Sequence, residues 1–189
     1  MDVILGYIQD MWLYMMITTP MIIVFRMYKI KKTNQVVNYF HEIGVVFFFI
    51  FIIGLLSQTI IPHVLIKDGS VIFVNGTFQS TNLEFFRVLS ETYNAIKYLN
   101  YWQPFLINFI GNIVMFIPIG FLLPLLWKKF HNGFITVSIG FLISFSIEIL
   151  QLPQMRSSDV DDLWLNTLGA LMGYFVFFFI PRTVRARFK

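Results

Sequence analysis

A short stretch near the carboxyl end holds most of the side chains that could do chemistry. Glu148 and Gln151 end a long apolar run, and a turn with one arginine and three aspartates follows: Arg156, Asp159, Asp161 and Asp162. A carboxylate inside a membrane is costly, so Glu148 should face other helices, be protonated or have a partner. Arg156 is the nearest cation in sequence and suits a phosphate or carboxylate. We therefore favour a binding or catalytic role for these two residues over a purely structural one.

Asparagines recur at helical spacing around this stretch. Asn108 and Asn112 are four residues apart, as are Asp162 and Asn166, and this spacing places each pair on one face of a helix. Such amides either join neighbouring helices by hydrogen bonds or line a site. Asp161 and Asp162 also suit the capping of a helix that begins nearby.

The three aspartates admit a second chemistry. Asp159, Asp161 and Asp162 could hold a divalent cation such as Mg²⁺ or Ca²⁺, because these hard ions prefer oxygen ligands. Glu148 would then be a general base, and the catalytic set of a metal-dependent transferase or hydrolase would be Glu148, Asp159 and Asp162. This alternative requires at least two of the carboxylates to converge on one point.

The composition is that of an integral membrane protein. Of 189 residues, 57% are apolar and 13% are charged, whereas a soluble domain has about 25% charged residues. The mean hydropathy is +0.72. A soluble domain, a disordered chain and a nucleic-acid binder are excluded, although the pI is about 9.4. There is no cysteine and the three histidines are scattered, so a cysteine-ligated metal and a zinc site are not expected.

Long runs without charge predict where the chain crosses the bilayer, since a spanning helix needs about 20 apolar residues. The first of these segments is interrupted by Pro20, and its alternative is an amphipathic anchor on the cytoplasmic surface. We predict about five transmembrane helices, at 7–28, 44–61, 104–127, 133–151 and 163–180.

The distribution of charge predicts the orientation. Ten of the fourteen basic residues fall on one side of this arrangement, in the 26–42 connection, at Lys128 and Lys129, and in the 182–189 tail. The positive-inside rule then puts the amino terminus outside and the carboxyl terminus in the cytoplasm. The chain divides into a first helix with a basic cytoplasmic connection (1–42), a membrane domain (43–181) and a basic cytoplasmic tail (182–189).

The outside loop, 63–103, has structure of its own. Residues 63–66 and 71–74 flank an Asp-Gly pair, and Asn75 and Gly76 follow, which predicts a small β-hairpin or meander. Asn82 would cap a helix to about Asn100 that lies in the outer interface. The fold class is therefore an all-α integral membrane helical bundle with a small extracytoplasmic β-hairpin or meander and an interfacial helix.

Three segments together resemble the VanZ-like family. The first is 108–124, NFIGNIVMFIPIGFLLP. The second is SIEILQ at 146–151, followed by RSSDVDD at 156–162, Asn166, Gly169 and Gly173. The third, at 82–86, is similar to an Asn-Leu-x-Pro-Phe element, with Phe85 in place of the proline. The pattern of acidic and amide residues in the second segment is specific to the family, whereas the apolar residues would match many membrane helices.

The resemblance implies a multi-pass protein of the bacterial cytoplasmic membrane. The namesake is associated with resistance to teicoplanin-type glycopeptides, which carry a fatty acyl tail. It also implies a site at Glu148, Gln151, Arg156, Asp159, Asp162 and Asn166. The position of the polar residues near the outer ends of the predicted helices leads to the same set.

Our hypothesis is that the chain binds an amphipathic ligand at the outer leaflet. The candidates are a lipid-linked envelope precursor and an acylated glycopeptide, with a role in antibiotic resistance or envelope homeostasis. The expected binding residues are Asn108, Asn112, Glu148, Gln151, Arg156, Asp159, Asp162 and Asn166. We expect membrane lipids as partners, no nucleic acid and no cofactor. The alternative is the metal-dependent enzyme, acting on lipid headgroups.

Overall fold

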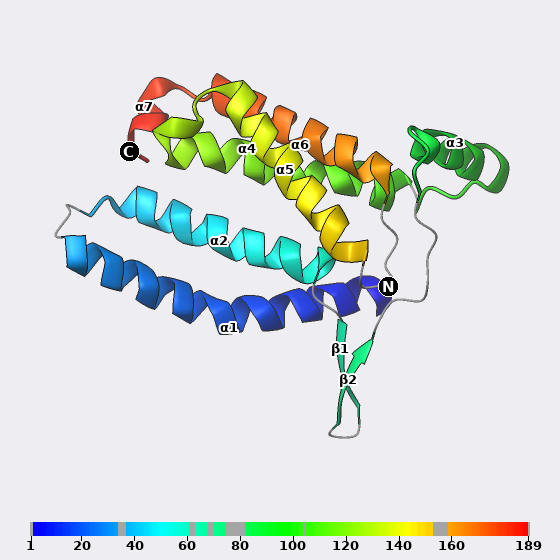
Figure 1. The fold of residues 1–189 in the computed structure, drawn as a ribbon, viewed down its shortest axis with the longest axis horizontal. Helices are drawn as coiled ribbons and strands as arrows, with labels where there is room; N and C mark the ends of the chain where they lie inside the picture. The colour runs from blue at the N-terminus through cyan, green and yellow to red at the C-terminus, as the bar shows by residue number, and fades with distance from the viewer. Residues whose placement is uncertain are drawn as a thin grey trace. The chain divides into compact units, whose positions relative to one another are not determined.

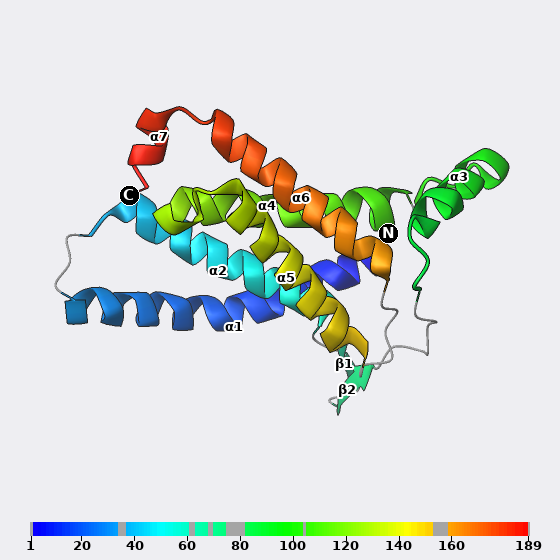
Figure 2. The same cartoon turned by 45° about the horizontal axis from the view of Figure 1, so that its top comes forward.

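The computed structural model describes residues 2–33, 37–60, 63–67, 70–74, 82–103, 105–152 and 159–188. Figures 1 and 2 show its ribbon in two views. The chain divides into two compact units, Met1–Gly76 with Pro181–Lys189 and Thr77–Ile180. The elements in chain order are α1 (Asp2–Thr33), α2 (Tyr39–Thr59), β1 (His63–Lys67), β2 (Ser70–Val74), α3 (Arg87–Leu99), the π-helix η1 (Phe105–Gly111), α4 (Asn112–Leu126), the short 3₁₀ turn η2 (Lys128–Phe130), α5 (Gly133–Gln151), α6 (Val160–Phe179) and α7 (Arg182–Ala186).

Two long helices make up most of the first unit. α1 and α2 lie side by side and run in opposite directions in both views (Figures 1 and 2). The Asn38 side chain caps α2 by accepting a hydrogen bond from the His41 amide at 3.3 Å. Arg26 of α1 pairs with Glu42 of α2, which ties the two helices together close to their connection.

Three shorter elements complete this unit. β1 and β2 pair antiparallel, from His63 opposite Val74 to Lys67 opposite Ser70. The Asp68-Gly69 turn and the expected turn at Asn75 and Gly76 lie outside the described residues. At the carboxyl end, the residues around α7 pack on the start of α2: the Phe188 carbonyl is hydrogen-bonded to His41 Nδ1 at 3.0 Å.

The second unit is a bundle of α4, α5 and α6. Glycines let α4 and α6 approach until their backbones touch. A Cβ on Gly173 would lie 2.0 Å from the Ile117 carbonyl oxygen, and one on Gly169 would lie 2.1 Å from that of Ile113. The G-x-x-x-G spacing predicts this close approach, because small residues remove the side-chain barrier between helices.

Four helical stretches of the described residues are long and apolar enough to cross a membrane. They are α2, the continuous η1–α4 stretch Phe105–Leu126, α5 and α6. The expectation of five spans is therefore supported for four of them, and α1 is not among these four. The apolar side chains of α1 are spread around the helix instead of forming one stripe, which does not favour an amphipathic surface anchor.

Candidate functional site

Asp159 organises the start of α6. It has extended backbone angles and caps the helix, with its Oδ1 accepting a hydrogen bond from the Asp161 amide at 2.8 Å. The same oxygen accepts from Asn82 Nδ2 at 2.8 Å, and the Val160 amide donates to the Asn82 carbonyl at 3.1 Å. The segment before α3 is thereby fixed to the start of α6. The carboxylate also lies at the positive end of the helix dipole, where it is stabilised.

Glu148 lies in the last turns of α5 and faces the bundle. It is only 9% exposed, and its Oε2 accepts a hydrogen bond from the Asp159 amide at 3.0 Å. This carboxylate therefore joins the end of α5 to the start of α6. The expectation that Glu148 turns away from lipid and toward polar partners is met.

Asp162 connects α6 to α4. Its Oδ1 accepts a hydrogen bond from Asn112 Nδ2, and the same amide group donates to the Asn108 carbonyl at 2.9 Å. Asn108 takes part through its backbone, while its own side chain is exposed. Asn108 lies in the π-helix η1, whereas Asn112 begins α4, so the two residues belong to helices of different type.

Asn166 lies one turn beyond Asp162 and faces α5. Its Nδ2 donates to Ser144 Oγ at 2.9 Å, and both residues are buried, at 5% and 0% exposure. Asn166 Oδ1 is also buried and has no hydrogen-bond partner among the described residues. Rotating the amide by 180° would exchange the two atoms and leave the nitrogen without an acceptor. One polar group of this side chain thus stays unsatisfied, at a cost of about 1–3 kcal/mol.

We call this set the polar cluster: Asn112, Ser144, Glu148, Asp159, Asp162 and Asn166. The VanZ/LLP1 family model matches residues 11–181. The chain belongs to the VanZ/LLP1 family. No curated protein and no solved structure gives a match. Family membership and the four apolar helices identify a multi-pass VanZ-like membrane protein and support a role in resistance.

Most residues of the VanZ-like site predicted from sequence are brought together. Glu148 accepts from the Asp159 amide, Asp162 bonds Asn112 of α4, and Asn166 bonds Ser144 of α5. Gln151 ends α5, is half-buried and has an interaction partner. Arg156, the expected cation of the site, lies outside the described residues.

Asp161 corrects one sequence expectation. It does not cap α6; instead, its fully buried carboxylate reaches the start of α3. Oδ1 accepts from the Phe86 amide at 2.6 Å and from Trp164 Nε1 at 2.8 Å, and Oδ2 accepts from the Val88 amide at 2.7 Å. α3 therefore begins at Arg87, not at Asn82, and its first turn is capped by a residue 73 positions away.

The three aspartates point to three different partners. Asp159 turns to Asn82, Asp161 to the start of α3 and Asp162 to α4. Within the part of the chain that the structure describes, no group of three or more His, Asp or Glu side chains is placed to hold a metal ion. This geometry gives no support to the metal alternative.

Asn82 is the residue that sequence reasoning placed in the wrong role. It was expected to cap α3, but its amide binds the Asp159 carboxylate, and its own Oδ1 accepts from the Glu84 amide at 3.0 Å. The available signal was the similarity of residues 82–86 to a family element, which marks the segment without showing its partner.

Proposed function

We propose that this VanZ-like protein binds an acylated, amphipathic molecule at the outer leaflet. The ligand classes are a lipid-linked envelope precursor and a teicoplanin-type glycopeptide. The observation that carries the proposal is Asn166 Oδ1, a buried acceptor without a partner among the described residues, inside the polar cluster. Buried polar groups in proteins are normally hydrogen-bonded. A hydroxyl or amide of a ligand headgroup would satisfy this acceptor.

The surroundings of the polar cluster favour a ligand with an apolar tail. α5 carries Ser144 and Glu148 on the face toward α6, whereas Phe141, Leu142, Phe145 and Ile149 are 40–56% exposed. An acyl tail that leaves the lipid and packs along these side chains stays in apolar surroundings. The hydrogen bonds between the headgroup and the polar cluster then determine which ligand is bound.

The orientation that we propose follows from charge. Basic residues at 26–32, at Lys128 and Lys129 and at 182–187 would be cytoplasmic, which puts the amino terminus outside and the polar cluster near the outer surface. A lipid-linked precursor and an acylated glycopeptide are both available there. Holding either one would keep the antibiotic from its target, and this is how we account for a role in resistance.

A metal-dependent transferase or hydrolase is the second candidate. It would use Glu148 as a base and a divalent cation on Asp159, Asp161 and Asp162. It is less well supported, because both oxygens of Asp161 accept hydrogen bonds from protein groups.

Native mass spectrometry of the purified full-length protein tests the proposal. The probes are an acylated teicoplanin-type glycopeptide and the same compound without its acyl chain. We expect a complex with the acylated form, and Asn166→Leu should weaken it about tenfold, because the ligand loses one hydrogen-bond acceptor in a buried site. Ser146→Ala is the matched control, since Ser146 is exposed on α5 and bonds its own helix.

Two outcomes would count against this function. Equal binding by wild type and Asn166→Leu would remove Asn166 from the site. Equal binding of the acylated and deacylated compounds would remove the apolar tail from recognition. Asn166→Leu removes the bond to Ser144 Oγ together with the unsatisfied acceptor, so a thermal melt checks that the variant is folded before its binding is compared.

A further inference from the structure

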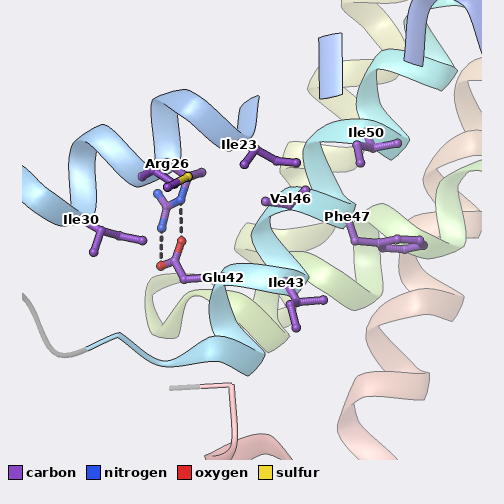
Figure 3. A pocket seen from close by; sticks show the side chains of 9 residues that line it. Ile23, Arg26, Ile30, Glu42, Ile43, Val46, Phe47 and Ile50 are labelled. Carbon is purple, nitrogen blue, oxygen red and sulfur yellow. Dashed lines mark hydrogen bonds and ion pairs between the residues drawn. The ribbon is translucent and has the colours of Figure 1, made fainter. Parts of the chain in front are cut away.

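An apolar groove lies in the first unit, between α1 and α2. Its volume is about 450 Å³, within the range of about 300–1,000 Å³ typical of ligand sites. The walls are aliphatic or aromatic: Ile23 and Ile30 come from α1, and Ile43, Val46, Phe47 and Ile50 come from α2 (Figure 3). From Ile23 to Ile30 the groove follows α1 for about 10 Å, at 1.5 Å per residue.

One charged pair lies in this groove. Arg26 Nη2 is 2.6 Å from Glu42 Oε1, and Arg26 Nε is 2.8 Å from Glu42 Oε2 (Figure 3). The two side chains are 16% and 20% exposed, so the pair is largely removed from solvent. A guanidinium has five N–H groups, and two of those of Arg26 donate to Glu42, so three are not bonded to this carboxylate.

Basic residues gather at the same end of the unit. Lys29, Lys31 and Lys32 are exposed at the end of α1. The residues around α7 contact the start of α2 through the bond between His41 and the Phe188 carbonyl, and they bring further arginines to this unit: Arg182, Arg185 and Arg187. Glu42 is the one acidic side chain among the described residues of 20–50. An apolar groove with a basic mouth is complementary to a molecule that has a fatty chain and an anionic head.

We infer that the α1–α2 groove binds one acyl chain of an anionic phospholipid, with the headgroup phosphate held by Arg26 and the lysines at the end of α1. The positive-inside rule places this end at the cytoplasmic leaflet, where anionic lipids are accessible. The groove uses none of the residues of the polar cluster. The bound lipid would contact both helices and so strengthen their association, which otherwise relies on the Arg26–Glu42 pair and apolar packing.

The test is competition between two lipids on the full-length protein in detergent, followed by native mass spectrometry. Phosphatidylglycerol and phosphatidylcholine with identical acyl chains are supplied at equal concentration. We expect one retained phosphatidylglycerol, favoured about tenfold over phosphatidylcholine, since each lysine or arginine near the headgroup adds to the attraction.

Two substitutions separate the groove from the charges. Val46→Trp should fill the groove and abolish retention of both lipids. Phe49→Trp is its matched control, because Phe49 is on the same helix, is 41% exposed and does not line the groove. The triple variant Lys29→Gln, Lys31→Gln, Lys32→Gln should still retain lipid but lose the preference for phosphatidylglycerol.

Three results would overturn the inference. They are equal retention of the two lipids by wild type, equal retention by Val46→Trp and Phe49→Trp, and an unchanged preference in the triple variant. A thermal melt checks that each variant is folded. Should Val46→Trp melt well below its control, the triple variant decides the question, because its exposed side chains can be changed without altering packing.

Discussion

The carboxylate of Asp161 should hold the first turn of α3 in place, and Asp161→Asn tests this directly. The wild-type side chain accepts three hydrogen bonds, two on Oδ1 and one on Oδ2. In the variant, the oxygen can keep the bonds from Phe86 and Trp164. The new NH₂ group then faces the Val88 amide, so two donors meet where a donor and an acceptor met before.

The expected magnitude follows from the bond that is lost. A hydrogen bond to a charged group contributes about 1.5–3 kcal/mol. Since about 1.4 kcal/mol corresponds to a factor of ten, the first turn of α3 should open about ten to a hundred times more often. Phe86 adds to this effect, because its φ of 65° is a left-handed conformation that costs about 1–3 kcal/mol and must be held by its surroundings.

Hydrogen–deuterium exchange of the purified protein measures the opening. Peptides that cover 82–92 should exchange faster in Asp161→Asn, and peptides from the middle of α5 should not change. Glu84→Gln is the matched control, because it removes one exposed charge from the same segment without touching the cap. Exchange in 82–92 at the same rate for both variants would refute the assignment of Asp161 as the cap of α3.

Two further substitutions test the packing of each unit. Gly173→Ala should lower the melting temperature, at a cost of about 1–3 kcal/mol or more, because its Cβ would lie 2.0 Å from the Ile117 carbonyl oxygen. Gly54→Ala is the control and should be tolerated, since its Cβ would make an ordinary contact of 3.5 Å. Equal melting temperatures of the two variants would contradict the close approach of α4 and α6. Glu42→Gln should lower the melting temperature of the apo protein, since it leaves a largely buried Arg26 without its counter-charge. The same variant should gain more thermal stability from phosphatidylglycerol than wild type does, and an unchanged lipid response would contradict a role for Arg26 at the headgroup.

The membrane helices were predictable from the sequence because their signal is local. Runs without charge, such as 133–147, fix α5 to the residue, and α4 ends within one residue of its predicted end. The close approach at Gly169 and Gly173 was also predictable, since small residues four apart in a membrane helix typically let a neighbouring helix approach. The start of α6 was placed three residues late, because its cap, Asp159, was not distinguished from the other aspartates.

The partners of the polar residues were not predictable in the same way. Helical spacing placed Glu148 and Ser144 on one face and Asp162 and Asn166 on another. The structure joins Asn166 to Ser144, whereas Asp162 bonds Asn112 of α4 and Glu148 bonds the Asp159 amide. The contact between Asp161 and Val88 joins residues 73 positions apart, and no spacing rule reaches that far. The π-helix at the start of this span was not predictable either, since local spacing does not distinguish it from an α-helix.

The acidic motif at the start of α6 acts as a joint among three elements. Successive helical residues turn by about 100°, so neighbouring side chains cannot share one partner. Asp161 therefore faces α3 and Asp162 faces α4, while Asp159 holds the Asn82 segment before α3. One turn further along α6, Asn166 bonds Ser144 of α5. Loss of function on substituting Asp159 or Asp161 would reflect loss of this joint. Asn166 differs because its side chain keeps an unsatisfied buried acceptor beside its hydrogen bond to Ser144.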